Sequence, residues 1–335
     1  MAERAAIKRV KENYKGAILA KPNVIGVGTG YKISNGVRTS EMCLVTLVRQ
    51  KMPLDGLAPQ AVVPKSLDGV LTDVIEVGDV KALQSPTDRW RPAPGGVSIG
   101  HYKITAGTLG AIVRDRSSGV RLILSNNHVL ANSNDASPGD PILQPGTADG
   151  GTTAADVIAH LERFCPIQFS LEPGTCSLAS SFVELGNAIA SVLGSKHRVQ
   201  AVRADQQATN LADCAVARPV NDGDVLDSIL NIGVVSGTVE ATLGMALRKS
   251  GRTTGLTTGE ISVLDATVNV SYGSGRVASF ENQIVAGPMS QGGDSGSLVV
   301  AGDALKAVGL LFAGSDQSTI INPIQAVLDC LSVTI

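Results

Sequence analysis

Apolar residues near both ends of the chain repeat with the spacing of a helix. The N-terminal residues on one such face are Ile7, Val10, Tyr14 and Ile18. Pro22 cannot continue a helix, so the pattern predicts a helix that ends near residue 20. Residues 323–331 also place their apolar side chains on one face, which predicts a C-terminal helix.

Short apolar runs separated by turn residues predict strands in the first third of the chain. Residues 23–33 and 37–49 flank Ser-Asn-Gly at 34–36, a sequence that favours a hairpin turn. A connector rich in proline and glycine covers residues 53–64, and residues 70–77 predict another strand. We expect an N-terminal α+β extension over residues 1–95 that packs on the rest of the protein; an active-site plug and an assembly surface are the alternatives.

The remainder of the chain continues the rhythm of strands and turns. β-branched and apolar runs predict strands at residues 122–124, 261–264 and 298–300, and the loop at 86–96 leads into this second region. Because these runs are short and glycine is frequent, we expect a mainly β domain over residues 96–335.

One helix interrupts this β pattern, within an insertion at about residues 150–200. It is predicted at residues 177–194, where the apolar side chains at helical spacing are Leu178, Phe182, Leu185, Ile189 and Val192. Gly194 suits its C-terminus. We expect a packing helix near the rim of the active site, with a lid or a contact between copies of the chain as alternatives.

The segment Gly292-Gly293-Asp294-Ser295-Gly296-Ser297-Leu298 carries the strongest chemical signal. Glycine on both sides leaves the Ser295 hydroxyl accessible, and glycine permits the backbone angles of a tight turn. The amides of Gly293 and Ser295 are then candidates for an oxyanion hole around a serine nucleophile. The alternative is an ordinary Gly/Ser turn between two strands.

A serine nucleophile needs an imidazole base, and His128 is the best candidate. It follows the apolar run Leu122-Ile123-Leu124 and the polar triplet Ser125-Asn126-Asn127, which places it at the end of a strand. The other histidines lie in polar surroundings that predict surface positions: His101, His160 and His197.

Asp213 is the candidate third member of this group. It is a single acid among small and apolar residues, in Asn210-Leu211-Ala212-Asp213-Cys214-Ala215, and a buried carboxylate needs a partner. A strand-end cap is the alternative role. The chain order of His128, Asp213 and Ser295 is the order of the triad in chymotrypsin-type proteases.

The chain therefore resembles the trypsin-like, chymotrypsin-fold serine peptidases, in particular intracellular bacterial members and those of the plant narrow-leaf type. The matching stretches, within residues 106–335, are Ser125-Asn126-Asn127-His128-Val129-Leu130-Ala131, Ala212-Asp213-Cys214-Ala215-Val216, Lys249-Ser250-Gly251-Arg252-Thr253-Thr254-Gly255 and Gly293-Asp294-Ser295-Gly296-Ser297. The resemblance implies two antiparallel six-stranded β-barrels with a catalytic cleft between them. It departs from the family at Ser297, where a glycine is usual, and in the long gap between His128 and Asp213, which requires an insertion.

The resemblance also implies a primary substrate pocket. Met289 would form its floor, and Phe312, Ala313 and Gly314 would form a wall strand. Because a methionine cannot pair with a basic side chain, we expect preference for an uncharged residue before the scissile bond. Asp294 could receive an amino terminus freed by processing, but nothing in the sequence requires it.

Composition and charge narrow the classes of partner. A formal net charge of −2 and the lack of a dense basic run disfavour nucleic acid. No apolar run approaches the ~18 residues that span a bilayer. Gly26, Gly28 and Gly30 lead into a strand rather than a helix, so no dinucleotide cofactor is expected.

Five cysteines occur without a ligand-like spacing, so no metal site is predicted. Cys165 and Cys176 could pair, but the N-terminal segment lacks a secretory apolar region, and free thiols in a cytoplasmic protein are the expectation. The sequence thus predicts a serine endopeptidase that needs no cofactor. A catalytically silent peptide-binding module, an esterase and a homo-oligomeric assembly remain open.

Overall fold

The computed structural model describes residues 2–34, 36–80, 84–174, 176–205, 208–302 and 304–335. The chain divides into two compact units, Met1–Gln84 and Ser85–Ile335. The sequence-based boundary after residue 95 falls inside the second unit, at the end of β5 (Ala93–Gly95). The turn predicted at 34–36 includes residue 35, which lies outside the described residues.

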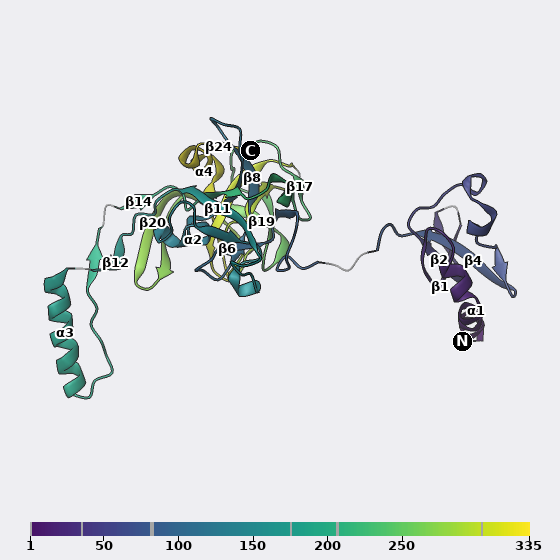
Figure 1. The fold of residues 1–335 in the computed structure, drawn as a ribbon, viewed down its shortest axis with the longest axis horizontal. Helices are drawn as coiled ribbons and strands as arrows, with labels where there is room; N and C mark the ends of the chain where they lie inside the picture. The colour runs from purple at the N-terminus through teal and green to yellow at the C-terminus, as the bar shows by residue number, and fades with distance from the viewer. Residues whose placement is uncertain (1, 35, 81–83, 175, 206–207, 303) are drawn as a thin grey trace. The chain divides into compact units, whose positions relative to one another are not determined.

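The N-terminal unit packs one helix on a four-stranded sheet (Figure 1). The elements are α1 (Ala2–Leu19), β1 (Val24–Ser34), β2 (Val37–Val48), β3 (Ser66–Leu67) and β4 (Val70–Glu76). β1 and β2 are antiparallel, as predicted, and β4 runs parallel to β2. Ile7, Val10 and Ile18 of α1 are buried with Leu44 of β2, so the apolar stripe of the helix forms this small core.

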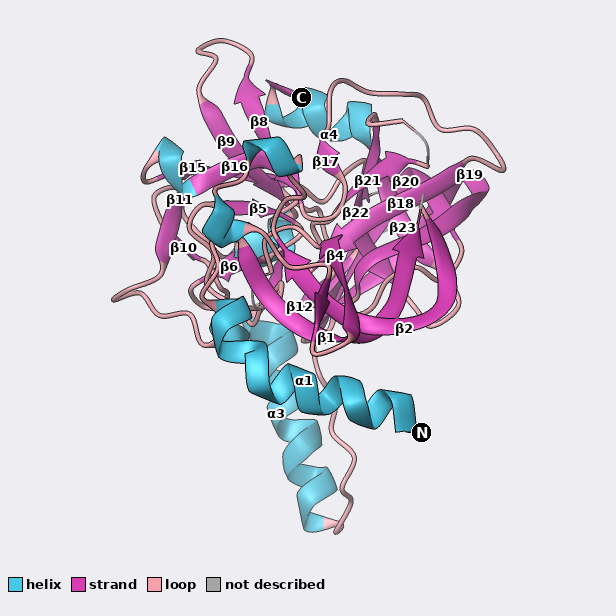
Figure 2. Cartoon of the chain, turned by 90° about the vertical axis from the view of Figure 1, so that its right-hand side faces the viewer, coloured by secondary structure: helices cyan, strands magenta, loops and turns pink. Residues whose placement is uncertain are grey.

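Two curled sheets dominate the second unit, and Figure 2 shows them on opposite sides of it. The first sheet has the order β24-β8-β9-β15-β11-β10-β6-β7. Its strands are β6 (Ser98–His101), β7 (Gly107–Thr108), β8 (Ala111–Asp115), β9 (Arg121–Ser125), β10 (Pro141–Leu143), β11 (Val157–Phe164), β15 (Ala215–Pro219) and β24 (Val333–Thr334). β16 (Val225–Ile229) and β17 (Gly233–Val234) form a separate small sheet with β5.

The second sheet contains a closed ring. β20 pairs with both β19 and β23, so the order β20-β19-β18-β21-β22-β23 returns to its start. Its strands are β18 (Ala246–Gly251), β19 (Gly255–Gly273), β20 (Arg276–Ala286), β21 (Leu298–Ala301), β22 (Ala307–Gly314) and β23 (Thr319–Pro323), with β12 (Leu171–Pro173), β13 (Val202–Ala204) and β14 (Thr209–Asn210) added beside β20. The predicted mainly β architecture is confirmed, and its two curled sheets are consistent with the expected chymotrypsin-type double barrel.

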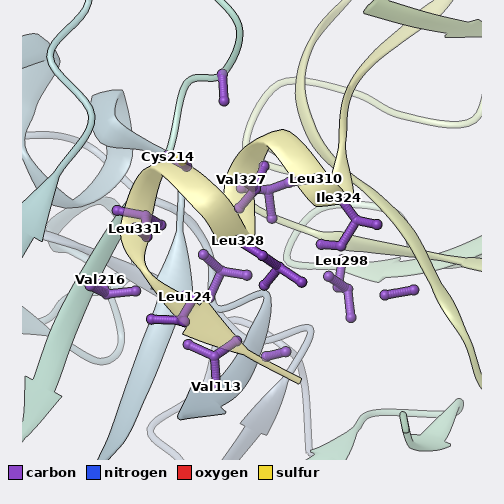
Figure 3. Packing of buried hydrophobic residues seen from close by; sticks show 14 of the residues in the cluster. Val113, Leu124, Cys214, Val216, Leu298, Leu310, Ile324, Val327, Leu328 and Leu331 are labelled. Carbon is purple, nitrogen blue, oxygen red and sulfur yellow. The ribbon is translucent and has the colours of Figure 1, made fainter. Parts of the chain in front are cut away.

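A shared core joins the two sheets through the C-terminal helix, α4 (Ile324–Leu331). Figure 3 shows residues from the first sheet, from the second sheet and from α4 in one cluster, labelled Val113, Leu124, Cys214, Val216, Leu298, Leu310, Ile324, Val327, Leu328 and Leu331. Burying each large apolar side chain of this kind stabilises the fold by roughly 1.5–3 kcal/mol. The helix predicted at 323–331 therefore packs against both sheets and stabilises their association.

The inserted helix α3 (Ser177–Val192) forms where the apolar pattern predicted it, but it does not pack as expected. None of its described side chains is buried, and Phe182 and Val192 are 76% and 88% exposed. Figure 1 shows α3 standing away from the sheets at the end of β12. The expectation of a packing helix at the active-site rim was wrong, because the helix sits on an arm of two short strands, β12 and β13, that pair with each other.

Two of the five cysteines differ from the predicted free thiols, whereas Cys43, Cys176 and Cys214 are free as expected. Cys165 forms a disulfide with Cys330, not with Cys176, because folding brings the end of β11 against α4. Cys214 keeps a buried thiol, and its Sγ lies 3.3 Å from the Sγ of Cys165. Among the described residues, no helix combines the length and the apolar character needed to cross a bilayer.

Candidate active site

His128 is held by the polar triplet that precedes it. β9 ends at Ser125, and His128 lies in the short helix α2 (Asn127–Leu130). The side-chain amide of Asn126 donates to the carbonyl of Asp213 at 2.7 Å, and the amide of Asn127 donates to the carbonyl of Cys165 at 2.7 Å. Both bonds reach across to a neighbouring segment, so they fix the direction in which the chain turns after β9 and the position of the imidazole.

Asp213 orients this imidazole. Its Oδ2 atom lies 2.6 Å from Nδ1 of His128, and its Oδ1 atom accepts the backbone N–H of His128 at 3.2 Å. The Asp213 side chain is fully buried, and its own backbone N–H donates to Asn322. Because a carboxylate oxygen accepts hydrogen bonds, this contact assigns the ring proton to Nδ1 of His128 and leaves Nε2 free to act as a base.

Ser295 lies in a turn that requires glycine at two positions. The φ angles of Gly293 and Gly296 are +97° and +94°. A Cβ atom on Gly293 would lie 2.5 Å from Oγ1 of Thr253, and one on Gly296 would lie 2.0 Å from Oγ of Ser125. These contacts and angles exclude other residues, which explains the glycines of the motif in physical terms.

Thr108 of the first sheet sets the orientation of the same turn. Its backbone N–H donates to the carbonyl of Ser295 at 2.8 Å, and its hydroxyl donates to the carbonyl of Gly293 at 2.9 Å. Within the described part of the chain, no hydrogen bond occupies the amides of Gly293 and Ser295. These are the two donors that the sequence suggested for an oxyanion hole.

His128 and Ser295 line one cavity of about 1080 Å³. The hydroxyl of Ser295 donates to the carbonyl of Phe312 at 3.4 Å, and among the hydrogen bonds of the described residues there is none between Ser295 and His128. Of the predicted pocket residues, Phe312, Ala313 and Gly314 line this cavity. Met289 does not: it is 3% exposed and packs in the core of the second sheet with Leu247 and Ile261, among others.

Asp294 is engaged by a side chain rather than by an amino terminus. Nζ of Lys249 lies 3.2 Å from its Oδ2 atom, and both side chains are fully buried. The remaining donors to its two oxygens are Thr253 N, Thr254 N, Thr254 Oγ1 and Gln291 N, at 2.6–3.1 Å. The role considered for a freed N-terminus is therefore filled by Lys249.

The pKa values of both partners are lowered, a shift that favours the charged form of Asp294 and disfavours the charged form of Lys249. Burial works to raise the pKa of Asp294, but hydrogen bonds, led by that from Thr254, bring it below its usual value together with Lys249. Burial lowers the pKa of Lys249, and Asp294 only partly offsets this. We take the carboxylate as ionised, because four donors besides Lys249 stabilise its charge.

Sequence reasoning missed the roles of Lys249 and Tyr272. Lys249 belongs to the stretch Lys249–Gly255 that was already part of the resemblance, but nothing in the neighbouring residues marks it as the partner of Asp294. Tyr272 gave no sequence signal, yet its hydroxyl donates to Oδ2 of Asp213 at 2.8 Å.

The surface position expected for His101 was also wrong. This histidine ends β6 and is fully buried, with Nε2 3.1 Å from Oδ2 of Asp140. Burial lowers its pKa, and the contact with Asp140 partly opposes that shift. The residue lies outside the cavity shared by His128 and Ser295.

The fold and the arrangement of His128, Asp213 and Ser295 can be compared with those of known proteins. The second unit is mainly β with two curled sheets, as expected for the double barrel of the chymotrypsin-type serine peptidases. No family model matches the chain. Streptogrisin-D from Streptomyces griseus is 42% identical over 78 residues, which are 23% of this chain. The match covers 18% of that relative, less than a fifth of its length.

Similar solved structures are bacterial serine proteases of low sequence identity. Nocardiopsis protease is 18% identical with a TM-score of 0.45, and the comparison covers 72% of this chain and 98% of that one. A glutamic acid-specific serine protease is 20% identical with a TM-score of 0.46, over 72% and 100% of the two chains. Thermobifida fusca Protease A is 16% identical with a TM-score of 0.44, over 72% and 98%.

Proposed function

We propose that this protein is a serine endopeptidase that cleaves peptide bonds through an acyl-enzyme. The observation that carries the proposal is the 2.6 Å contact between His128 and the buried Asp213, on a cavity that Ser295 also lines. A buried carboxylate that fixes an imidazole beside a serine in a glycine turn is the arrangement that activates a hydroxyl.

The mechanism follows from the roles of these groups. The Ser295 hydroxyl rotates away from its long bond to the Phe312 carbonyl, attacks the substrate carbonyl and gives its proton to Nε2 of His128. The amides of Gly293 and Ser295 stabilise the oxyanion. His128 then protonates the leaving amine, and a water molecule activated by the same nitrogen hydrolyses the acyl-enzyme.

The substrate preference is proposed from the cavity wall. The described lining residues are mostly apolar side chains and hydroxyls, and Asp316, which is exposed, is the carboxylate among them. A cavity of this kind favours an uncharged residue before the scissile bond. A peptide library with all residues at that position tests this preference; cleavage mainly after Arg or Lys would assign the selectivity to Asp316.

A peptide-binding module without catalysis is the second candidate. It is favoured by one observation, the bond from Ser295 to Phe312 in place of one to His128. Catalytic hydrogen bonds are often long or absent until substrate binds, so this bond does not exclude the enzyme.

Casein hydrolysis by purified wild type, Ser295→Ala and Ser262→Ala distinguishes the two candidates. Ser262 is an exposed serine of β19 outside the cavity and serves as the matched control. The endopeptidase proposal expects activity in wild type and Ser262→Ala and a loss of at least a thousandfold in Ser295→Ala. Equal rates in all three, or none in any, would reject it.

The cellular compartment and the assembly state also belong to this proposal. A cytoplasmic location was expected because the N-terminal segment lacks a secretory apolar region, whereas the Cys165–Cys330 disulfide is typical of oxidising surroundings. The apolar face of α3 is a surface through which copies of the chain could associate.

A further inference from the structure

The β19–β20 hairpin brings a phenol to the catalytic carboxylate. Tyr272 is the second-last residue of β19, and its hydroxyl donates to Oδ2 of Asp213 at 2.8 Å. The same oxygen faces Nδ1 of His128 at 2.6 Å. Asp213 therefore shares one carboxylate oxygen between its imidazole partner and a residue from the other sheet.

The tip of the hairpin contacts the segment that connects β9 to β10. Arg276, at the start of β20, forms two contacts with the carboxylate of Asp135, at 2.8 and 3.1 Å. Its guanidinium also lies 5.1 Å from the ring centre of Phe169. The ring of Tyr272 packs edge-on against Phe169 and against His128, at centroid distances of 5.7 and 5.9 Å. These contacts hold the phenol in place without its hydroxyl.

The hydroxyl of Tyr272 is suited to remain a donor. Burial, followed by the charge of Asp213, raises its pKa well above the usual value for a tyrosine. It thus stays protonated over the range in which a serine peptidase works. A fully buried carboxylate needs hydrogen-bond donors, and Tyr272 supplies Asp213 with one from a different element than His128.

We infer that Tyr272 is a positioning residue of the active site, which fixes the Asp213 carboxylate so that it holds His128 in the productive orientation. The inference rests on the proposed peptidase function. Tyr272 acts through Asp213 and donates no proton to substrate. Tyr272 also lines the cavity and could contact the substrate directly. Loss of such a contact would change KM, whereas loss of the bond to Asp213 would change kcat and its pH dependence.

The test compares wild type with Tyr272→Phe, which removes the oxygen and keeps the ring. Thr267→Ala, an exposed residue of β19 outside the cavity, is the matched control. We expect Tyr272→Phe to lower kcat roughly tenfold with little change in KM, the loss of one hydrogen bond to a charged group. The half-point of the acid limb of kcat/KM should move to higher pH, because a carboxylate with one donor fewer stabilises the imidazolium more strongly.

Two outcomes would overturn the inference: a pH profile that superimposes on wild type, or a change confined to KM. A second readout does not depend on turnover. The Nδ1 proton of His128, observed by NMR in protein with labelled histidine, should change its chemical shift in Tyr272→Phe and not in Thr267→Ala. If the wild type is inactive, an NMR change still supports the bond while the peptidase proposal fails; an active wild type with no NMR change rejects only the role of Tyr272.

Discussion

The buried Lys249–Asp294 pair offers a test of how the nucleophile turn is built. Asp294 lies between Gly293 and Ser295, so its position sets the direction of both oxyanion amides. Lys249→Met removes the ammonium and keeps a side chain of similar length. The carboxylate then remains buried with its other donors but without a counter-charge.

The loss of unfolding free energy in Lys249→Met follows from the burial of the pair. Removing one partner of a buried ion pair costs about 3–5 kcal/mol. Asp294 keeps four hydrogen-bond donors from Thr253, Thr254 and Gln291, so we expect the lower end, about 3 kcal/mol of unfolding free energy. Because the turn carries both oxyanion donors, kcat should also fall, by roughly a hundredfold if one donor is displaced.

The assay is urea unfolding followed by the fluorescence of Trp90, the single tryptophan of the chain, which lies in the second unit. Lys196→Met, at an exposed position, serves as the control. The double variant Lys249→Met with Asp294→Asn removes both charges and should recover much of the lost stability. An unfolding free energy of Lys249→Met within about 1 kcal/mol of wild type, with kcat unchanged, would show that Lys249 does not stabilise the turn, since losses in cores and buried networks exceed that value.

The same pair predicts a pH dependence. The pKa of Asp294 lies below its usual value in the folded protein, so between the two values the unfolded chain binds more protons than the folded one. This carboxylate therefore stabilises the fold above about pH 4, and the contribution is lost as pH falls through the native pKa. Asp294→Asn should flatten the fall in stability below that pH.

Three further predictions concern the turn, the disulfide and the exposed helix. Gly293→Ala forces a side chain into a position of positive φ against Thr253, and we expect a loss of kcat of at least a hundredfold; near-normal turnover would contradict the oxyanion assignment. Cys330→Ser opens the bond to Cys165 and should reduce the unfolding free energy by about 2–4 kcal/mol in denaturant titrations under non-reducing conditions, with no effect expected if the bond does not form. Phe182→Glu, on the exposed face of α3, should shift any dimer seen by sedimentation toward monomer, whereas an unchanged profile would remove this face as the contact.

Local patterns predicted much of the fold. The helical spacing of apolar residues predicted α1, α3 and α4, and the alternation of short apolar runs with glycine-rich turns predicted the β architecture. The packing of α3 could not be predicted in this way. Its amphipathic pattern is typical of a helix that packs on a hydrophobic core. In the structure α3 follows the paired strands β12 and β13 instead, and none of its described side chains is buried.

Some residues of the candidate site could be predicted from the sequence and others could not. His128, Asp213 and Ser295 each carry a local signal, and folding brings His128 and Asp213 into contact. Met289 was assigned to the pocket by position alone, but the turn directs it into the core of the second sheet. Lys249 and Tyr272 act through partners far away in sequence, and such contacts leave no trace in the neighbouring residues.

A fluorophosphonate label, located by mass spectrometry of the labelled protein, reports directly whether Ser295 is a nucleophile activated by His128 and Asp213. We predict one adduct, on Ser295, with labelling abolished in Ser295→Ala and slowed strongly in His128→Ala. Labelling at another residue, or none at all on a folded protein, would contradict it.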